Sequence, residues 1–393
     1  TANLTADLTI NTDFAQVEVD EQQVNLTRFN LQFPEKRDFF LEGRGIFDFG
    51  RGSGQGAGNN SGITPQLFYT RRIGLNRNRV VPITVGGRLT GKVDKFSVGL
   101  LNIQTAEEPL ALSPSTNFTV VRVKRDVFRR SSVGAMFTNR SAATVGDGTN
   151  QGYGVDGAFS FFENLNLSGY YAATETEALT GDEESYQGRF DWAPDRYGVR
   201  VEHTKVGDDF NPEVGFIRRD DFDRTYGLLR FSPRPESIEA VRKFTWEASL
   251  EYLENGLGQL ETRSQVGRFN TEFETSDQFT LEASNNYELL VAPFLIAPGV
   301  IIPPGGYTFA DATVSYQFGQ QRRISGTVGF QRGGFYDGDI TAVTVSSARI
   351  SVTPQLSIEP SLSINDIDLP YGDFTNTLLR ARTDFAFSPR MFA

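Results

Sequence analysis

Cysteine is absent from this sequence of 393 residues, and histidine occurs once, as His203. The lack of cysteine excludes disulfide scaffolds and thiolate metal sites. A zinc ion at His203 would have to complete its ligands with carboxylates alone, which is an unusual set. A Ser-His-Asp triad would need the same histidine, and no G-x-S-x-G motif flanks any serine. We therefore expect no catalytic residues, no metal and no cofactor.

Positive charge and long apolar runs are also scarce. The chain has 38 Lys and Arg against 49 Asp and Glu, a net charge of −11, so it lacks the basic surface that nucleic acids require. No stretch approaches the ~20 apolar residues of a membrane-spanning helix. The longest candidate, Leu289 to Gly306, is interrupted by four prolines. We expect a flexible apolar loop there.

Glycine and phenylalanine are abundant, with 39 and 33 residues, whereas hydrophobic residues as a whole reach only 38%. Apolar and polar residues alternate with a period of two in many short runs, and no segment keeps a helical period. In one such run, apolar Phe244, Trp246, Ala248, Leu250 and Tyr252 alternate with polar Thr245, Glu247, Ser249 and Glu251. The sequence therefore predicts an all-β chain.

Strand length and connections narrow the fold class further. The alternating runs span about 8–13 residues, at or above the ~9–11 that cross a bilayer when tilted. Short turns such as Asp94-Lys95 and Glu163-Asn164 alternate with long, polar, Gly-rich links. Aromatic residues lie near the short turns, as an interfacial girdle would: Phe161, Phe162, Trp192, Phe279, Phe318 and Phe387. We predict one domain, residues 1–393, forming a large antiparallel outer-membrane β-barrel of roughly 16–20 strands.

The side of each strand that carries polar residues is expected to face the lumen. By this alternation Arg88, Arg189, Arg200 and Glu247 point inward, where charges can be hydrated or paired. They would either tune solute passage or brace the wall. His203 has the opposite parity and is expected on the outer face.

One segment, residues 11–65, does not fit the pattern. It is too long for an ordinary link, since loops beyond ~15 residues are usually functional or structured. The charges of "PEKRDFF" cannot face lipid. We predict a plug-like or constricting segment whose lumen contacts come from Glu35, Lys36, Arg37 and Glu42, with Phe39 and Phe40 packed as anchors. If the segment contains no strand, counting strands back from the short turns places its start at the short-turn end of the barrel. A hidden strand near Leu26 to Phe33 would place its start at the opposite end.

The same region carries a family resemblance. The stretches "NTDFAQVEVD", "NLTRF", "FPEKRDFFLEG" and "LFYTRRIGL", followed by "GGRLTGKVDKFSVGLLNIQT", are similar to an uncharacterised bacterial envelope family. Its members join an N-terminal carbohydrate-binding-like module of the family-9 type to a C-terminal outer-membrane barrel. The resemblance implies that such a module precedes Thr1. The turn signal in "FSPRMFA" leads us to expect a further strand as well. Some family members are labelled hydrolases, but no catalytic residues carry over.

Three functions stay open at this stage. The first is a porin-like pore or transport channel in the outer membrane of a Gram-negative-type bacterium, with a saccharide as one expected solute. The second is a non-conducting scaffold for the carbohydrate-binding-like domain or for envelope partner proteins. The third is an outer-membrane hydrolase. The expected surroundings are the lipid bilayer and lipopolysaccharide, with no nucleic acid.

Overall fold

One antiparallel sheet of 19 strands dominates the computed structural model, which describes residues 3–12, 20–50, 63–76, 79–388 and 391–392. We call this sheet the wall. Its strands are β1 (Leu4–Thr12), β4 (Ile83–Val93), β5 (Phe96–Thr105), β6 (Thr116–Phe128), β7 (Ser131–Arg140), β8 (Asn150–Phe161), β9 (Leu165–Thr176), β10 (Glu184–Trp192), β11 (Tyr197–Val206), β12 (Phe222–Phe231), β13 (Val241–Asn255), β14 (Leu260–Phe273), β15 (Gln278–Leu290), β18 (Gly305–Phe318), β19 (Ile324–Phe335), β20 (Gly338–Ser351), β21 (Leu356–Leu369), β22 (Gly372–Ser388) and the short β23 (Met391–Phe392). The predicted all-β fold class is confirmed.

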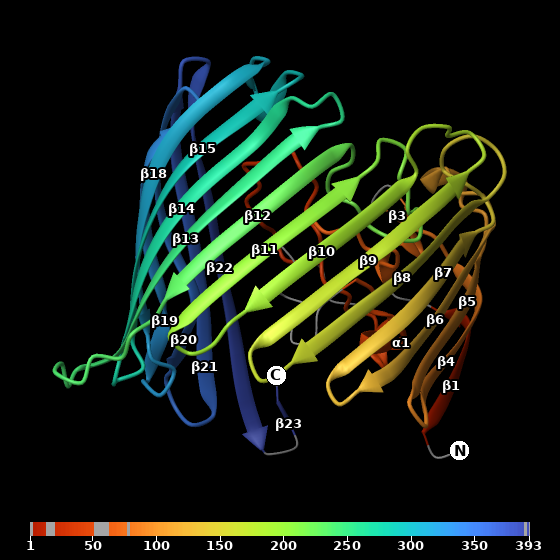
Figure 1. Ribbon diagram of the computed structural model, residues 1–393, viewed down its shortest axis with the longest axis horizontal. Helices are drawn as coiled ribbons and strands as arrows, with labels where there is room; N and C mark the ends of the chain where they lie inside the picture. The colour runs from red at the N-terminus through yellow and green to blue at the C-terminus, as the bar shows by residue number, and fades with distance from the viewer. Residues whose placement is uncertain (1–2, 13–19, 51–62, 77–78, 389–390, 393) are drawn as a thin grey trace.

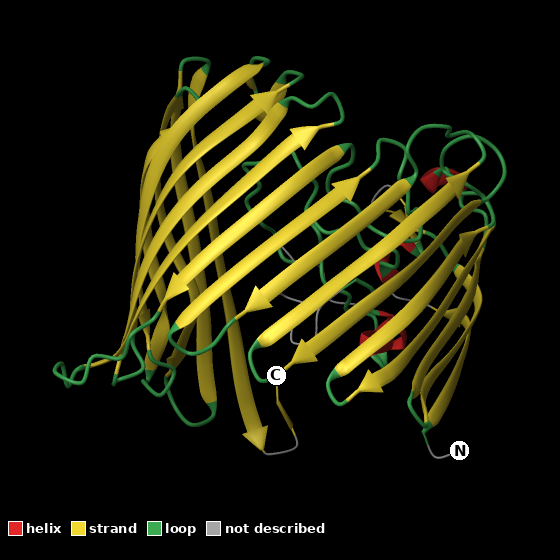
Figure 2. Ribbon diagram, viewed as in Figure 1, coloured by secondary structure: helices red, strands yellow, loops and turns green. Residues whose placement is uncertain are grey.

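The wall follows the order of the chain. Each strand pairs antiparallel with the next wall strand, β4 with β1 and β18 with β15 included. The sheet curls around an interior that holds the short helices (Figures 1 and 2). Among the described residues no hydrogen-bonded pairing joins β1 to β22. The curved sheet thus has the shape of a barrel wall.

Apolar side chains cover the outer face of the wall and polar ones the inner face. On β11, for example, Val201 is 48% exposed whereas its neighbour Glu202 is 8% exposed. The outward apolar side chains that remain exposed include Val155, Phe190, Leu229, Trp246, Leu250, Leu281, Val314 and Val328. A sheet in water would bury this face, so the arrangement is that of a wall surrounded by lipid.

The two ends of the wall have different connections. At one end, the short-turn end, links such as 94–95, 162–164 and 274–277 are brief, although 232–240 is longer. The other end, the long-loop end, carries links such as 106–115 and 207–221. The expected regular alternation holds only for the first half of the chain. Later strands extend further, so the predicted long link around 333–339 shrinks to a turn at Tyr336 and Asp337.

The predicted flexible loop between Leu289 and Gly306 is wrong. β15 and β18 extend into it, and a hairpin of β16 (Phe294–Ala297) and β17 (Val300–Ile302) fills the rest. The prolines lie outside the hairpin strands, where no ladder hydrogen bond is lost. The hairpin packs on an apolar cluster that includes Ile340 and Leu369.

The inner segment, our name for residues 20–50 and 63–76, lies inside the curve of the wall. It contains α1 (Asp38–Leu41) and the 3-10 turns η1 (Arg44–Phe47) and η2 (Thr70–Arg72); η3 (Pro109–Ala111) lies in the link after β5. A small hairpin of β2 (Leu75–Asn76) and β3 (Arg79–Val80) leads to β4. Within the described part of the chain, no helix combines the length and the apolar character needed to cross a membrane.

Two expectations about residues 11–65 need correction, and one open alternative is decided. Asn11 and Thr12 belong to β1, so the segment starts later. The alternative of a hidden strand near Leu26 to Phe33 does not hold, because residues 20–33 contain no strand. Thr12 pairs with Ile83 at the long-loop end, so the segment starts there and not at the short-turn end. Residues 13–19 and 51–62 of this prediction lie outside the described residues.

Candidate functional site

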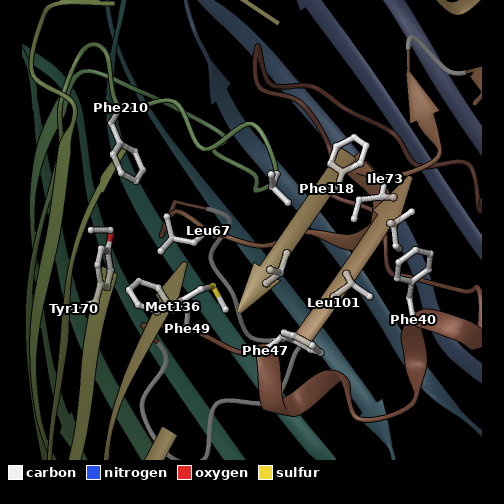
Figure 3. Close-up of a cluster of buried hydrophobic side chains, with 14 of the residues drawn as sticks. Phe40, Phe47, Phe49, Leu67, Ile73, Leu101, Phe118, Met136, Tyr170 and Phe210 are labelled. Atoms are coloured by element: carbon white, nitrogen blue, oxygen red, sulfur yellow. The ribbon is translucent and has the colours of Figure 1, made fainter. Parts of the chain in front are cut away.

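An apolar cluster fixes the inner segment against β4 to β9 and extends to β11, β12 and β13 through Val206, Phe222 and Leu253. Phe40, Phe47 and Phe49 are each no more than 6% exposed and pack with inward side chains of the wall (Figure 3). Phe49 lies beside Tyr170 of β9, with ring centroids 5.6 Å apart. A cluster of this kind inside the wall fills one side of the interior with side chains rather than water.

A β-bulge changes the inner face at the start of β4. Simple alternation from Val85, which lies on the outer face, would put Ile83 on that face too, but the pairing with β5 shifts register between these two residues. A bulge inserts one residue and reverses the side on which the following side chains lie. Ile83 is therefore 2% exposed and joins the apolar cluster inside.

Glu35 and Arg37 form a buried ion pair in the inner segment. Arg37 Nε and Nη2 donate to the two carboxylate oxygens of Glu35 at 2.8 and 2.7 Å. Arg37 also donates to the carbonyl oxygens of Ile73 and Thr70, at 2.7 and 2.8 Å. Burial alone would raise the pKa of Glu35, but the hydrogen bonds and charge of Arg37 outweigh it and hold that pKa below its usual value. The pair ties the two halves of the inner segment together.

Arg88 of β4 fastens helix α1 to the wall. Its guanidinium donates to the carbonyl oxygens of Phe39 and Glu42 at the end of the helix, and it pairs with Asp7 of β1 at 2.6 Å. The Glu42 carboxylate is 3.3 Å away and 65% exposed, so it contributes little. The Phe39 ring lies 5.3 Å from the Arg88 guanidinium. The backbone N–H of the half-buried Lys36 donates a hydrogen bond of 3.0 Å to the Glu35 carboxylate.

The inner segment also reaches the opposite part of the wall. Arg28 pairs with Glu288 of β15 at 2.8 Å and with Glu261 of β14. Glu21 pairs with Arg380 of β22. Residues 20–50 therefore extend across the interior, from β22 and β14–β15 to β4.

The link 207–221 folds inward onto the inner segment. Gln66 and Phe216 exchange two backbone hydrogen bonds of 2.9 Å, and Tyr69 N–H donates to the Val214 carbonyl oxygen. Phe210 and Val214 are 1% and 0% exposed. From the sequence this link was grouped with the long, polar connections, and its inward folding was not predicted. The apolar residues between its charged ends were the available signal for that folding.

Three of the predicted lumen residues pair with neighbouring residues of the wall. They are Arg189 on β10, Arg200 on β11 and Glu247 on β13. Arg189 and Arg200 both pair with Asp191, at 2.9 and 3.1 Å. Glu247 lies 3.7 Å from Arg268. These three thus form part of the wall lining, apart from the site around Glu35.

A polar recess of about 420 Å³ opens on the inner face of β13, β14, β15 and β18. Arg268 and Glu282 pair across it at 2.6 Å, and Asn270 donates to Thr280 at 2.8 Å. The complete lining is Thr245, Glu247, Arg268, Asn270, Gln278, Thr280, Glu282, Thr313 and Ser315. Every one of these side chains is polar, so the recess suits water and hydrophilic solutes.

His203 lies at the outer face, where its Nδ1 is 3.1 Å from the Thr225 hydroxyl and its Nε2 is 3.5 Å from Asp223. The described residues contain no group of three or more metal-ligating side chains. The imidazole ring also lies beside Tyr186 of β10, with ring centroids 6.1 Å apart.

A family profile described as "Domain of unknown function (DUF5916)" matches residues 1–85. This match covers the inner segment and most of the stretches that carry the resemblance described above. It does not extend to a carbohydrate-binding module. No curated protein matches the chain.

Two solved structures illustrate the similarity in fold. The outer membrane protein OpdK from Pseudomonas aeruginosa is 11% identical, with a TM-score of 0.46 over 78% of this chain and 95% of that one. OccAB3 from Acinetobacter baumannii is 10% identical, with a TM-score of 0.44 over 81% and 96%. At these values the likeness says nothing about what this chain transports or binds.

Proposed function

We propose that this protein is an outer-membrane channel whose lumen is narrowed by the inner segment. The observation that carries the proposal is the uneven filling of the interior. Apolar side chains occupy the space beside β4 to β9 and reach β11 to β13 near the long-loop end, whereas the inner face of β13 to β18 keeps its polar recess toward the short-turn end. Polar lining on an unfilled side is what a hydrated passage requires.

The outer face supports the membrane location that the proposal needs. Stacked aromatic rings follow the short-turn end: Tyr197 lies 5.5 Å from Phe231, Phe231 lies 5.8 Å from Trp246, and Trp246 lies 5.2 Å from Phe269. Aromatic rings of this kind favour the interface between hydrocarbon and headgroups. The rings thus support the proposed position of the wall in the outer membrane, where it would contact lipid and lipopolysaccharide.

Planar-bilayer recording tests the channel. The purified protein should give discrete current steps in potassium chloride, and a variant without residues 20–50 should give larger ones. A protein that inserts but stays electrically silent in both forms would contradict the proposal.

The scaffold is the second candidate. The ion pairs of Arg28 with β15 and of Glu21 with β22 favour it because, together with Arg88 of β4, they hold the segment across the lumen. Stable co-purification of envelope proteins with a silent barrel would support it.

A saccharide as the solute stays a prediction; a fall in current on adding an oligosaccharide tests it. A hydrolase has no residues in its favour.

A further inference from the structure

Three arginines surround one phenylalanine inside the long-loop end of the wall. The guanidinium carbons of Arg28, Arg218 and Arg219 lie 5.0, 5.5 and 5.2 Å from the ring centroid of Phe29. Arg28 and Phe29 belong to the inner segment, and the other two arginines to the link 207–221. In Figure 1 the red trace of the inner segment passes behind β11 and β12, on the side of this link.

The carboxylates of this cluster do not balance its charge. Glu261 pairs with both Arg28 and Arg219, and Glu288 pairs with Arg28. Three positive charges therefore face two negative ones. Within the described part of the chain, Arg218 forms no ion pair; its one side-chain hydrogen bond is a 3.3 Å contact from Nη2 to the Thr27 hydroxyl.

Two buried donors of the cluster are unused. The Nε atoms of Arg28 and Arg218 are buried and have no hydrogen-bond partner among the described residues. A buried donor without a partner costs free energy that a bound acceptor recovers. Guanidinium N–H groups match the oxygen atoms of carboxylates and phosphates in number and direction.

We propose that Arg218, with Arg28 beside it, binds an oxyanion at the long-loop mouth of the lumen: the carboxylate or phosphate group of a solute. The site rests on the proposed channel function and gives it a substrate class, because a cation at the mouth concentrates anions there. Both arginines come from segments that lie inside the wall, so the site forms only when the link 207–221 is folded onto the inner segment.

Calorimetric titration of the whole purified protein with sodium phosphate and, separately, with sodium acetate tests the site at constant ionic strength. We expect binding of at least one of the two anions, with affinity reduced about tenfold or more in Arg218→Ala and partly kept in Arg218→Lys. The matched control is Arg263→Ala. Its Nε is also buried without a partner, but the side chain lies on the outer face of β14, opposite Tyr252 and Tyr287, and forms no ion pair in the described residues. Its affinity should equal that of the wild type.

The two anions separate the two chemical sources, since a carboxylate site prefers acetate and a phosphate site prefers phosphate. Binding of neither anion, or equal affinity in Arg218→Ala and the wild type, overturns the site. Reversal potentials in bilayers then separate this proposal from the channel itself. A protein that conducts but shows no Arg218-dependent anion binding supports the channel and contradicts the anion site. A protein that is electrically silent but binds anions through Arg218 supports the anion site and contradicts the channel.

Discussion

Glu35 and Arg37 are two positions apart, and both are buried inside the wall, at 6% and 5% exposure. Their bidentate pairing leaves Arg37 free to donate to the carbonyl oxygens of Ile73 and Thr70 as well. One side chain thereby connects residues 35–37 with residues 70–73. The stability of the inner segment should depend on this pair more than on any exposed charge near it.

Replacing the carboxylate tests that dependence. Glu35→Gln leaves the Arg37 guanidinium buried without a counter-ion, which costs about 3–5 kcal/mol. We expect the loss in the local opening free energy of residues 35–47, measured by hydrogen exchange in micelles. Asp38→Asn is the matched control, because Asp38 is exposed and should change the opening energy by less than about 0.5 kcal/mol. Equal protection in Glu35→Gln and the wild type would show that the pair does not hold the segment.

The same pair predicts a response to acid. Since the pKa of folded Glu35 lies below its ordinary value of 4.5, the pair contributes its full stability above about pH 4.5. That stability is lost as the pH falls through the lowered pKa, when the carboxylate takes up a proton. The amide N–H groups of Lys36 and Arg37 both donate to Glu35, so their exchange protection reports the change directly. In Glu35→Gln the protection should no longer depend on pH in this range; an unchanged dependence would assign it to another group.

Arg88 should matter for the position of helix α1. Arg88→Ala removes the donor to the carbonyl oxygens of Phe39 and Glu42 and leaves Asp7 without its partner. Asp7 is 30% exposed, so water can replace its partner, and most of the cost, about 1–3 kcal/mol, comes from the lost donor to the two carbonyl oxygens. We expect loss of exchange protection in residues 38–47 and noisier single-channel currents. Lys92→Ala, on the same face of β4 but with its side chain 52% exposed, should leave both unchanged.

Alternation was sufficient to predict the wall, because a period of two assigns each side chain of a regular strand to one face. It placed Glu247 on the inner face and His203 on the outer face. It failed at Ile83, where a bulge reverses the face, and in the β16–β17 hairpin, whose prolines were read as breaking all structure.

The contacts of the inner segment were beyond reach for a different reason. Arg28 and Glu261 are separated by 233 positions, and Glu21 and Arg380 by 359. No local pattern specifies which distant charge a given arginine meets. The charges of "PEKRDFF" showed that the segment needs polar surroundings, whereas its partners follow only from how the wall curls. Whether these residues constrict a solute path stays a prediction.

Replacing a glycine of the wall with alanine tests how closely the inner segment packs on the wall. A Cβ atom at Gly99 of β5 would lie 2.8 and 2.9 Å from two ring atoms of Phe47. Gly99→Ala should therefore displace this ring at a cost of about 1–3 kcal/mol, seen as faster exchange or proteolysis at residues 44–50. Gly87→Ala on β4 is the control, since nothing lies within 4 Å of a Cβ there. Equal behaviour of the two variants would place Phe47 away from β5.

The two tryptophans of the chain offer a test of the membrane location. Trp192 at the end of β10 and Trp246 near the start of β13 both lie on the outer face at the short-turn end, 40% and 43% exposed. In bilayers containing lipids with a quencher at a defined depth, their fluorescence should fall most with quenchers just below the headgroups and less with quenchers at the bilayer centre. The single-tryptophan variants Trp192→Phe and Trp246→Phe should show the same depth, because the two residues lie in one belt. Fluorescence that responds only to a water-soluble quencher would mean that this face of the wall does not contact lipid.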